Sequence, residues 1–87
     1  MKIRTNKGFE SEARYAFAPT MQGNCMVSIP DKRPLSEICA DFEGVEEIQK
    51  TDEIEGDAVY FGYTNLIYAE RSQTDGNVTL ILAKGGV

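Results

Sequence analysis

The sequence contains no histidine. Catalytic Ser-His and Cys-His pairs need an imidazole as the base that activates their nucleophile, so both kinds of site are excluded. The phosphate-binding patterns G-x-x-x-x-G-K-[ST] and G-x-G-x-x-G do not occur either. Any catalysis would depend on carboxylates, lysine, tyrosine or cysteine alone. We therefore expect a protein that is not an enzyme and that binds no cofactor.

Cysteine is scarce, with only Cys25 and Cys39 in the chain. The two are far apart and form no C-x-x-C pair, so without histidine the sequence offers no zinc-binding pattern. A secreted domain of this size usually carries more cysteines for disulfides. Both residues fall among apolar positions, where a free cysteine behaves as a small hydrophobic residue. We expect two reduced, buried thiols and no metal site.

Long apolar runs are also missing. None approaches the roughly 18 residues that a membrane-spanning helix needs, and Met1 is not followed by a signal-peptide pattern. We expect no membrane partner and no secretion by a signal peptide. The length of 87 residues fits one domain, residues 1–87, with a small core.

Charge is plentiful but unevenly spread. The net charge of −5 argues against direct binding to nucleic acid or to an anionic membrane. Residues 37–57 hold nine of the acids and a single base, Lys50, which gives this acidic segment a charge of −8. The rest of the chain has five acids and eight bases and is therefore +3. Such an asymmetry can mark the surface that meets a partner.

The acidic segment does not match a calcium-binding EF-hand loop. Counting from Asp52, the third position is Ile54, and Gly56 falls at the fifth position rather than the sixth. Carboxylates on a helix and the next strand could instead imitate a row of phosphates and dock on a basic protein, or they could simply be a hydrated surface. The candidate partner-binding residues are Glu46, Glu47, Asp52, Glu53, Glu55, Asp57 and Tyr60.

The last third of the chain has the strongest strand pattern, because it is richest in β-branched and aromatic residues. We predict strands at 58–62, 65–72 and 78–84 that form a meander. The pair Asp75-Gly76 lies between the last two and predicts a type I′ turn, which requires φ > 0 at both central residues.

Earlier in the chain, short strands are predicted at 2–5 and 24–29, with a turn at Asn6-Lys7-Gly8 after the first. Residues 9–17 alternate between apolar and charged side chains. This period of two predicts one continuous strand that buries Phe9, Ser11, Ala13, Tyr15 and Phe17 on the same face.

The period then changes once. Leu35, Ile38, Cys39 and Phe42 follow the i, i+3, i+4, i+7 spacing of one helix face, with Pro34 before them and Gly44 after. We predict a helix at about 34–43 with Phe42 as its main core residue.

Residues 45–50 fit either a short strand or an extension of the helix, and residues 51–57 are predicted to be an exposed hairpin connection. The resulting order predicts an α+β, mainly β domain: a small antiparallel barrel or sandwich of about six to seven strands, with one helix after the third.

Four aromatic residues lie close together in the sequence: Tyr60, Phe61, Tyr63 and Tyr68. Aromatic rings with a polar tip are favoured at protein interfaces, but they also serve as core residues with the hydroxyl at the rim. We expect Tyr60 and, in a predicted loop, Met21 to be the most exposed of the large side chains.

Three runs together resemble a group of known proteins: Leu35–Ile48, Tyr60–Leu66 and Val78–Lys84. They are similar to short, uncharacterised proteins encoded by phages and prophages of Gram-positive bacteria. The shared features, Phe-Glu-Gly and Gly-Tyr-Thr, are structural rather than catalytic. The resemblance covers half to two-thirds of the chain and carries over no functional residues.

The resemblance implies a non-enzymatic phage accessory located in the bacterial cytoplasm or the virion. Its partner would be a virion or tail component, or a second copy of itself. The alternative is a small acidic inhibitor that docks residues 37–57 on a host nucleic-acid-binding defence protein, in the manner of an anti-CRISPR protein.

Overall fold

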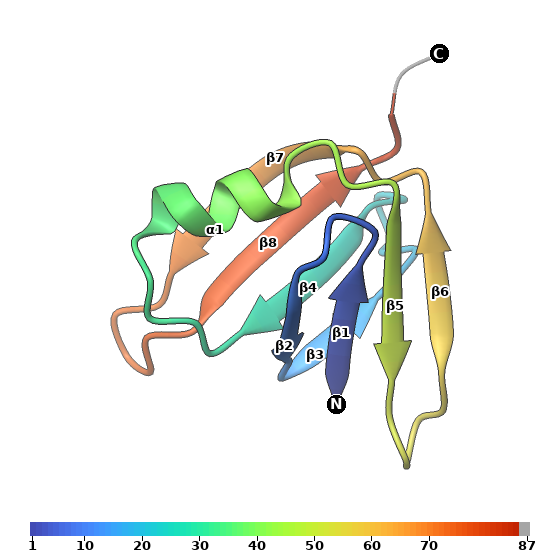
Figure 1. Ribbon diagram of the computed structural model, residues 1–87, viewed down its shortest axis with the longest axis horizontal. Helices are drawn as coiled ribbons and strands as arrows, with labels where there is room; N and C mark the ends of the chain where they lie inside the picture. The colour runs from blue at the N-terminus through green and yellow to red at the C-terminus, as the bar shows by residue number, and fades with distance from the viewer. Residues whose placement is uncertain (86–87) are drawn as a thin grey trace.

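The chain folds into two antiparallel sheets of four strands each, with one helix between them at one end (Figure 1). The computed structural model describes residues 1–85. The elements in chain order are β1 (Lys2–Thr5), β2 (Glu10–Glu12), β3 (Tyr15–Phe17), β4 (Cys25–Ile29), α1 (Leu35–Phe42), β5 (Glu47–Thr51), β6 (Ala58–Phe61), β7 (Asn65–Arg71) and β8 (Val78–Ala83).

Sheet A has the strand order β2-β1-β5-β6, and sheet B has the order β3-β4-β8-β7. The prediction of a mainly β domain with one helix is confirmed, and the two facing sheets make it a sandwich. The strand count is eight rather than six to seven because one predicted strand is divided between the sheets.

The divided strand is the run 9–17. Its first part, β2, pairs with β1 in sheet A, and its second part, β3, pairs with β4 in sheet B. The chain changes sheet at Ala13, whose N–H bonds the carbonyl of Met1, and Arg14, whose N–H bonds the carbonyl of Ser28. The bend reverses the alternation, so Ala16 is buried and Phe17 is exposed. The predicted single buried face was therefore wrong beyond this point.

The predicted meander of the last three strands was also wrong. Strand β6 pairs with β5 in sheet A, whereas β7 and β8 pair with each other in sheet B. Residues 62–64 carry the chain across, starting at Gly62 with φ +83°. The N–H of Gly62 still bonds the carbonyl of Glu46, so β6 stays with sheet A to its end.

The turn between β7 and β8 differs from the predicted type I′ geometry. Gly76 has φ +75°, but within residues 1–85 no residue other than glycine has a positive φ, so Asp75 does not. The loop is longer, closed by a hydrogen bond from the N–H of Ser72 to the carbonyl of Asn77. The carboxylate of Asp75 accepts the N–H of Asn77 at 3.0 Å, and this bond lowers the pKa of Asp75.

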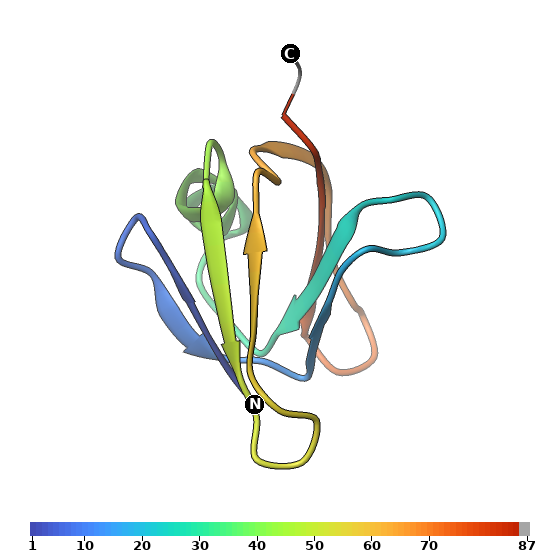
Figure 2. The same cartoon turned by 90° about the vertical axis from the view of Figure 1, so that its right-hand side faces the viewer.

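Helix α1 matches the prediction to within one residue at each end. It ends at Phe42, and Gly44, two residues further on, takes φ +71°, a conformation that glycine adopts without a steric penalty. Ile38 and Phe42 are completely buried, and the Phe42 ring meets the edge of Phe9 with the centroids 5.1 Å apart. The helix lies on the inner side of sheet B, the same side that sheet A covers (Figures 1 and 2).

The prediction that both cysteines are buried is confirmed for Cys25 and only partly for Cys39. Both are free thiols; Cys25 is buried and Cys39 is half-buried. Desolvation raises the pKa of the Cys25 thiol to about 12, so it stays protonated at neutral pH.

Candidate functional site

A row of apolar side chains crosses all four strands on the outer face of sheet B. The strand register places Phe17 opposite Met26, Met26 opposite Ile81, and Ile81 opposite Tyr68. Residues paired across antiparallel strands point to the same face of the sheet. We call these four residues the outer apolar row.

The outer apolar row is accessible to solvent. Phe17 is 42% and Tyr68 43% exposed, while Met26 and Ile81 are half-buried between them. Tyr15 extends the surface along β3, with its ring centroid 5.6 Å from that of Phe17. On β7 a bulge leaves Ile67, beside Tyr68 in sequence, 55% exposed.

Nothing in residues 1–85 covers this face. Sheet A and α1 both lie on the inner side of sheet B, and on the other side Figure 2 shows only the loops of sheet B's own hairpins, β3–β4 and β7–β8. The inward-facing residues of the same strands, such as Val27, Leu80 and Leu82, are fully buried. A contiguous exposed apolar surface on a folded domain commonly marks an interaction site.

One feature of the sequence could have pointed to the outer apolar row. Strand β8 reads Val-Thr-Leu-Ile-Leu-Ala, with Ile81 between two buried leucines. An antiparallel sheet with one face in water normally carries polar side chains at the outward positions. The isoleucine at position 81 departs from this pattern. The sequence-based candidates, taken from the acids and the tyrosine-rich run, did not include it.

The outer face of sheet A has a different character. Lys2 lies opposite Glu12, and Arg4 lies opposite Glu10, to which it makes an ion pair at 2.9 Å. Two exposed apolar residues of this face, Val59 at 45% and Phe61 at 59%, are on the edge strand β6, and Phe61 lies opposite Glu47. On β1 and β2 of this face, oppositely charged side chains therefore lie opposite each other.

The predicted acidic residues do not form one cluster. Glu46 and Glu47 lie at the start of β5, whereas the others lie in the loop after it. At about 3.4 Å per residue, the length of β5 separates the two groups by roughly 15–20 Å. Glu47 accepts a hydrogen bond from the side chain of Gln49 at 3.0 Å, and Glu46 is exposed.

Several acids of the β5–β6 loop have local structural roles. The carboxylate of Asp57 accepts the N–H of Asp52 at 3.2 Å, and that of Asp52 accepts the N–H of Glu55 at 3.0 Å. Glu55 also lies 3.7 Å from the ammonium of Lys50, which is buried. Some of the carboxylates that we interpreted as a docking surface therefore stabilise the turn itself.

Tyr60 is not the exposed residue that we predicted. It is half-buried, and its hydroxyl donates to the carbonyl of Ala16 at 3.2 Å. This bond links β6 of sheet A to β3 of sheet B, so Tyr60 ties the two layers together. Met21, predicted to be exposed in the loop before β4, is fully exposed.

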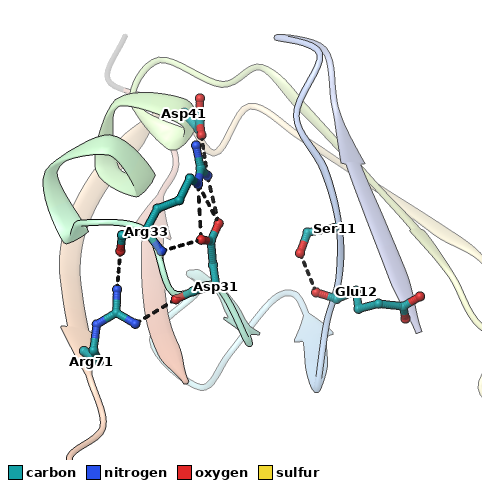
Figure 3. Close-up of polar contacts among 6 residues, drawn as sticks. All are labelled: Ser11, Glu12, Asp31, Arg33, Asp41 and Arg71. Atoms are coloured by element: carbon teal, nitrogen blue, oxygen red, sulfur yellow. Dashed lines mark hydrogen bonds and ion pairs between the residues drawn. The ribbon is translucent and has the colours of Figure 1, made fainter. Parts of the chain in front are cut away.

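A polar groove of about 430 Å³ lies between the β1–β2 turn and α1. Arg33 occupies its wall, with its guanidinium 2.8 Å from Asp31 and 2.7 Å from Asp41 (Figure 3). The guanidinium also lies 5.5 Å from the centre of the Phe9 ring. The hydrogen bond from Arg33 lowers the pKa of Asp31.

The arginine pair in this region fastens the loop before α1 to the sheet. Arg71 of β7 donates to the carbonyls of Asp31, at 2.7 Å, and Arg33 (Figure 3). Because two carboxylates already neutralise the Arg33 guanidinium, it is not available to bind an anion. We assign the cluster a structural role.

Within the described residues, no three ligand-type side chains come close enough together to hold a metal ion. In the same residues, no helix is long and apolar enough to cross a membrane. Comparisons with protein-family models, with curated proteins and with solved structures find no match.

Proposed function

We propose that this protein is a non-enzymatic protein-binding module whose contact surface is the outer face of sheet B. The observation that carries the proposal is the outer apolar row, which crosses a whole sheet and is covered by no element within residues 1–85. A rigid sheet holds these side chains in fixed positions, so little conformational entropy is lost when a partner packs on them.

The composition of the row supports binding to an apolar protein surface. Aromatic residues and methionine are enriched at the centres of protein interfaces, and Phe17, Tyr68 and Met26 supply both types. Met26 and Ile81 each pair with a row residue on both sides and are therefore the two central residues of the row. Residues near the middle of an interface usually carry most of the binding energy.

The resemblance to phage and prophage proteins supports a setting for this module. In that setting the partner is a virion or tail component, and the protein is found in the bacterial cytoplasm or the virion. A scaffold that presents one apolar sheet face suits a structural accessory, because it needs no catalytic groups.

The test is direct binding to a partner captured from phage-infected cells. Ile81→Lys places a charge in the centre of the row and should weaken binding of the purified partner at least about tenfold in calorimetry. Phe61→Lys is the matched control, because Phe61 is an exposed apolar residue on the other sheet; its affinity should stay within about twofold of the parent value. Equal losses in both variants, or none in Ile81→Lys, would refute this contact surface.

One observation favours the second candidate, an acidic inhibitor of a nucleic-acid-binding defence protein. At the tip of the β5–β6 loop, Ile54 is 94% exposed between the exposed carboxylates of Glu53 and Glu55. Charge at such a tip can guide a basic partner into contact. Under this candidate, Glu53→Gln with Glu55→Gln slows association several-fold and lessens its salt dependence, whereas Glu12→Gln on sheet A does neither.

A further inference from the structure

Strand β6 is an end strand of sheet A, and within residues 1–85 no strand pairs with its free edge (Figure 1). The N–H of Gly62 bonds the carbonyl of Glu46, so these two residues form a hydrogen-bonded pair between β6 and β5. Hydrogen-bonded and non-hydrogen-bonded pairs alternate along an antiparallel ladder. Val59 and Phe61 therefore occupy non-hydrogen-bonded positions. Their N–H and C=O groups point away from β5, toward the free edge.

Most of these edge-facing backbone groups lack a partner. Lys84 donates to the carbonyl of Phe61 at 2.7 Å. No hydrogen bond within residues 1–85 uses the N–H or the carbonyl of Val59, or the N–H of Phe61. The side chains beside them are 45% and 59% exposed. Unpaired backbone groups along an extended strand are complementary to another extended chain, so the edge favours an occupant in strand conformation.

The other three edge strands are protected in ways that β6 is not. Strand β2 carries Glu10 and Glu12, and charged side chains on an edge oppose further pairing. Strand β3 has three residues, and the carbonyl of Ala16 accepts the hydroxyl of Tyr60. Strand β7 is interrupted by a bulge and packs against α1. Strand β6, in contrast, consists of the four uncharged residues Ala58–Phe61.

The surroundings of β6 are acidic at both of its ends. The acids belong to the start of β5 or to the β5–β6 loop: Glu46, Glu47, Asp52, Glu53, Glu55 and Asp57. Glu47 lies opposite Phe61, so the first two acids are at the end of β6 and the other four are at its start. The bases in contact with the loop and with β6 are Lys50 and Lys84, which leaves the region net negative.

This charge distribution discriminates between occupants of the edge. An added strand lies about 4.8 Å from β6, so its ends come within roughly 5–10 Å of the acids, a distance over which salt screens incompletely. Antiparallel pairing with β6 of a second copy would place the acids at the end of one strand against the acids at the start of the other. Basic residues at both ends of an added strand would be attracted instead.

We propose that the free edge of β6 takes up an extended segment of another protein as a fifth strand of sheet A, and that this segment is apolar in the middle and basic at both ends. Hydrogen bonds to the backbone of Val59 and Phe61 hold the segment, and their side chains contact its apolar residues. The edge belongs to sheet A and not to the sheet with the outer apolar row, so it is independent of the contact surface in the proposed function.

A short synthetic peptide tests the edge directly. Its sequence has paired lysines at each end and alternating valine and threonine between them, and its binding is followed by fluorescence anisotropy. With valines opposite Val59 and Phe61, the N–H groups of the valines face β6. N-methylation of the valines should weaken binding at least about tenfold, whereas N-methylation of the threonines should change it less than about twofold. Replacing the lysines by glutamates should also weaken binding at least about tenfold.

Variants of the protein provide a matched comparison. Val59→Pro removes an edge-facing N–H without removing a β5–β6 hydrogen bond, and proline is tolerated at such positions on edge strands. It should weaken peptide binding at least about tenfold, whereas Glu12→Pro on the edge strand β2 should stay within about twofold of the parent value. Glu46→Gln with Glu53→Gln, one change at each end of β6, should weaken binding several-fold and lessen its salt dependence. Ile81→Lys should leave peptide binding unchanged, and circular dichroism establishes that each variant is folded.

Hydrogen exchange measured by NMR locates the bound peptide: the N–H groups of Val59 and Phe61 should exchange more slowly in the complex. Binding that survives N-methylation of the valines, or no binding at about 1 mM peptide, overturns the proposal without relying on any variant. A dimer of the protein alone that Val59→Pro abolishes would mean that a second copy occupies the edge, which also overturns it. Peptide binding that requires Ile81 but not Val59 would assign the peptide to sheet B, so the edge would fail while the proposed function stands.

Discussion

The two outer faces of the sandwich present different kinds of side chain to solvent. Both belong to antiparallel sheets of four strands whose inner faces are buried. On sheet A the outward side chains of β1 and β2 carry opposite charges, as in the Arg4–Glu10 ion pair, and β6 adds the exposed Val59 and Phe61. On sheet B they form an apolar row with exposed aromatic residues at both ends, Phe17 and Tyr68.

This difference in side chains affects how much free energy each face would release when a partner buries it. The charged groups of sheet A are already hydrated or paired with each other. Covering them would cost desolvation free energy and add little interaction energy. Phe17 and Tyr68 are 42% and 43% exposed, so covering each would stabilise a complex by roughly 1 kcal/mol, somewhat less than half the value for a fully exposed side chain. On sheet B such side chains form a row across all four strands, whereas on sheet A the exposed apolar side chains, Val59 and Phe61, are confined to β6.

The largest expected effect concerns the core that both sheets share. Phe42→Ala should lower the free energy of unfolding by about 3–5 kcal/mol, because Phe42 is completely buried and contacts Phe9 next to β2. Urea denaturation measures the loss, and amide hydrogen exchange should show reduced protection in both sheets. Loss of protection in one sheet alone would mean that the two faces rest on independent cores.

An intermediate effect is expected at the ion pairs beside α1. Interaction with Arg33 holds the pKa of Asp31 below its usual value of about 3.9. A lowered pKa stabilises the fold at pH values above the unfolded pKa, and this contribution is lost as the pH falls through the folded pKa.

Asp31→Asn should therefore cost about 0.5–1 kcal/mol at pH 7, the range for a solvent-screened pair, and less and less as the pH falls below about 4. Urea midpoints from pH 7 to pH 2 for the parent and the variant check this. A difference that stays constant down to pH 2 would contradict the electrostatic origin of the effect.

The smallest effect separates the two outer faces by their response to salt. Arg4→Gln removes the ion pair with Glu10 and should cost less than about 0.5 kcal/mol at low salt and nothing measurable at 1 M salt. Ile81→Thr should change the free energy of unfolding by an amount that does not depend on salt, because it alters an apolar surface. Thermal unfolding at two salt concentrations measures both, and equal salt responses would erase the electrostatic distinction between the faces.

Much of the local structure could be predicted from the sequence. The spacing of Leu35, Ile38, Cys39 and Phe42 predicted α1 within one residue at each end, because helical periodicity depends only on residues a few positions apart. The turn after β1 was also predicted: Gly8 has φ +90° and β1 pairs with β2. These features are decided by short-range sterics and hydrogen bonds.

The candidate site was predicted less well, since its members come from four separate strands. Phe17, Met26, Ile81 and Tyr68 become neighbours only through strand register. The sequence marked Tyr68 as part of an aromatic cluster and offered Ile81 as an apolar residue at an outward position. It also suggested that the acids of 46–57 would act together, although β5 holds them at two opposite ends.

By itself, then, the sequence determined the periodicities, the position of α1 and the mainly β character of the domain. Only the tertiary structure decided that the run 9–17 changes sheet at Ala13 and Arg14 and that β6 pairs with β5. It also decided that neither sheet A nor α1 covers the outer face of sheet B. The physical reason is that a strand's own residues fix its alternation but not its partner. Pairing, and which face meets water, depend on packing among segments that are distant in the chain.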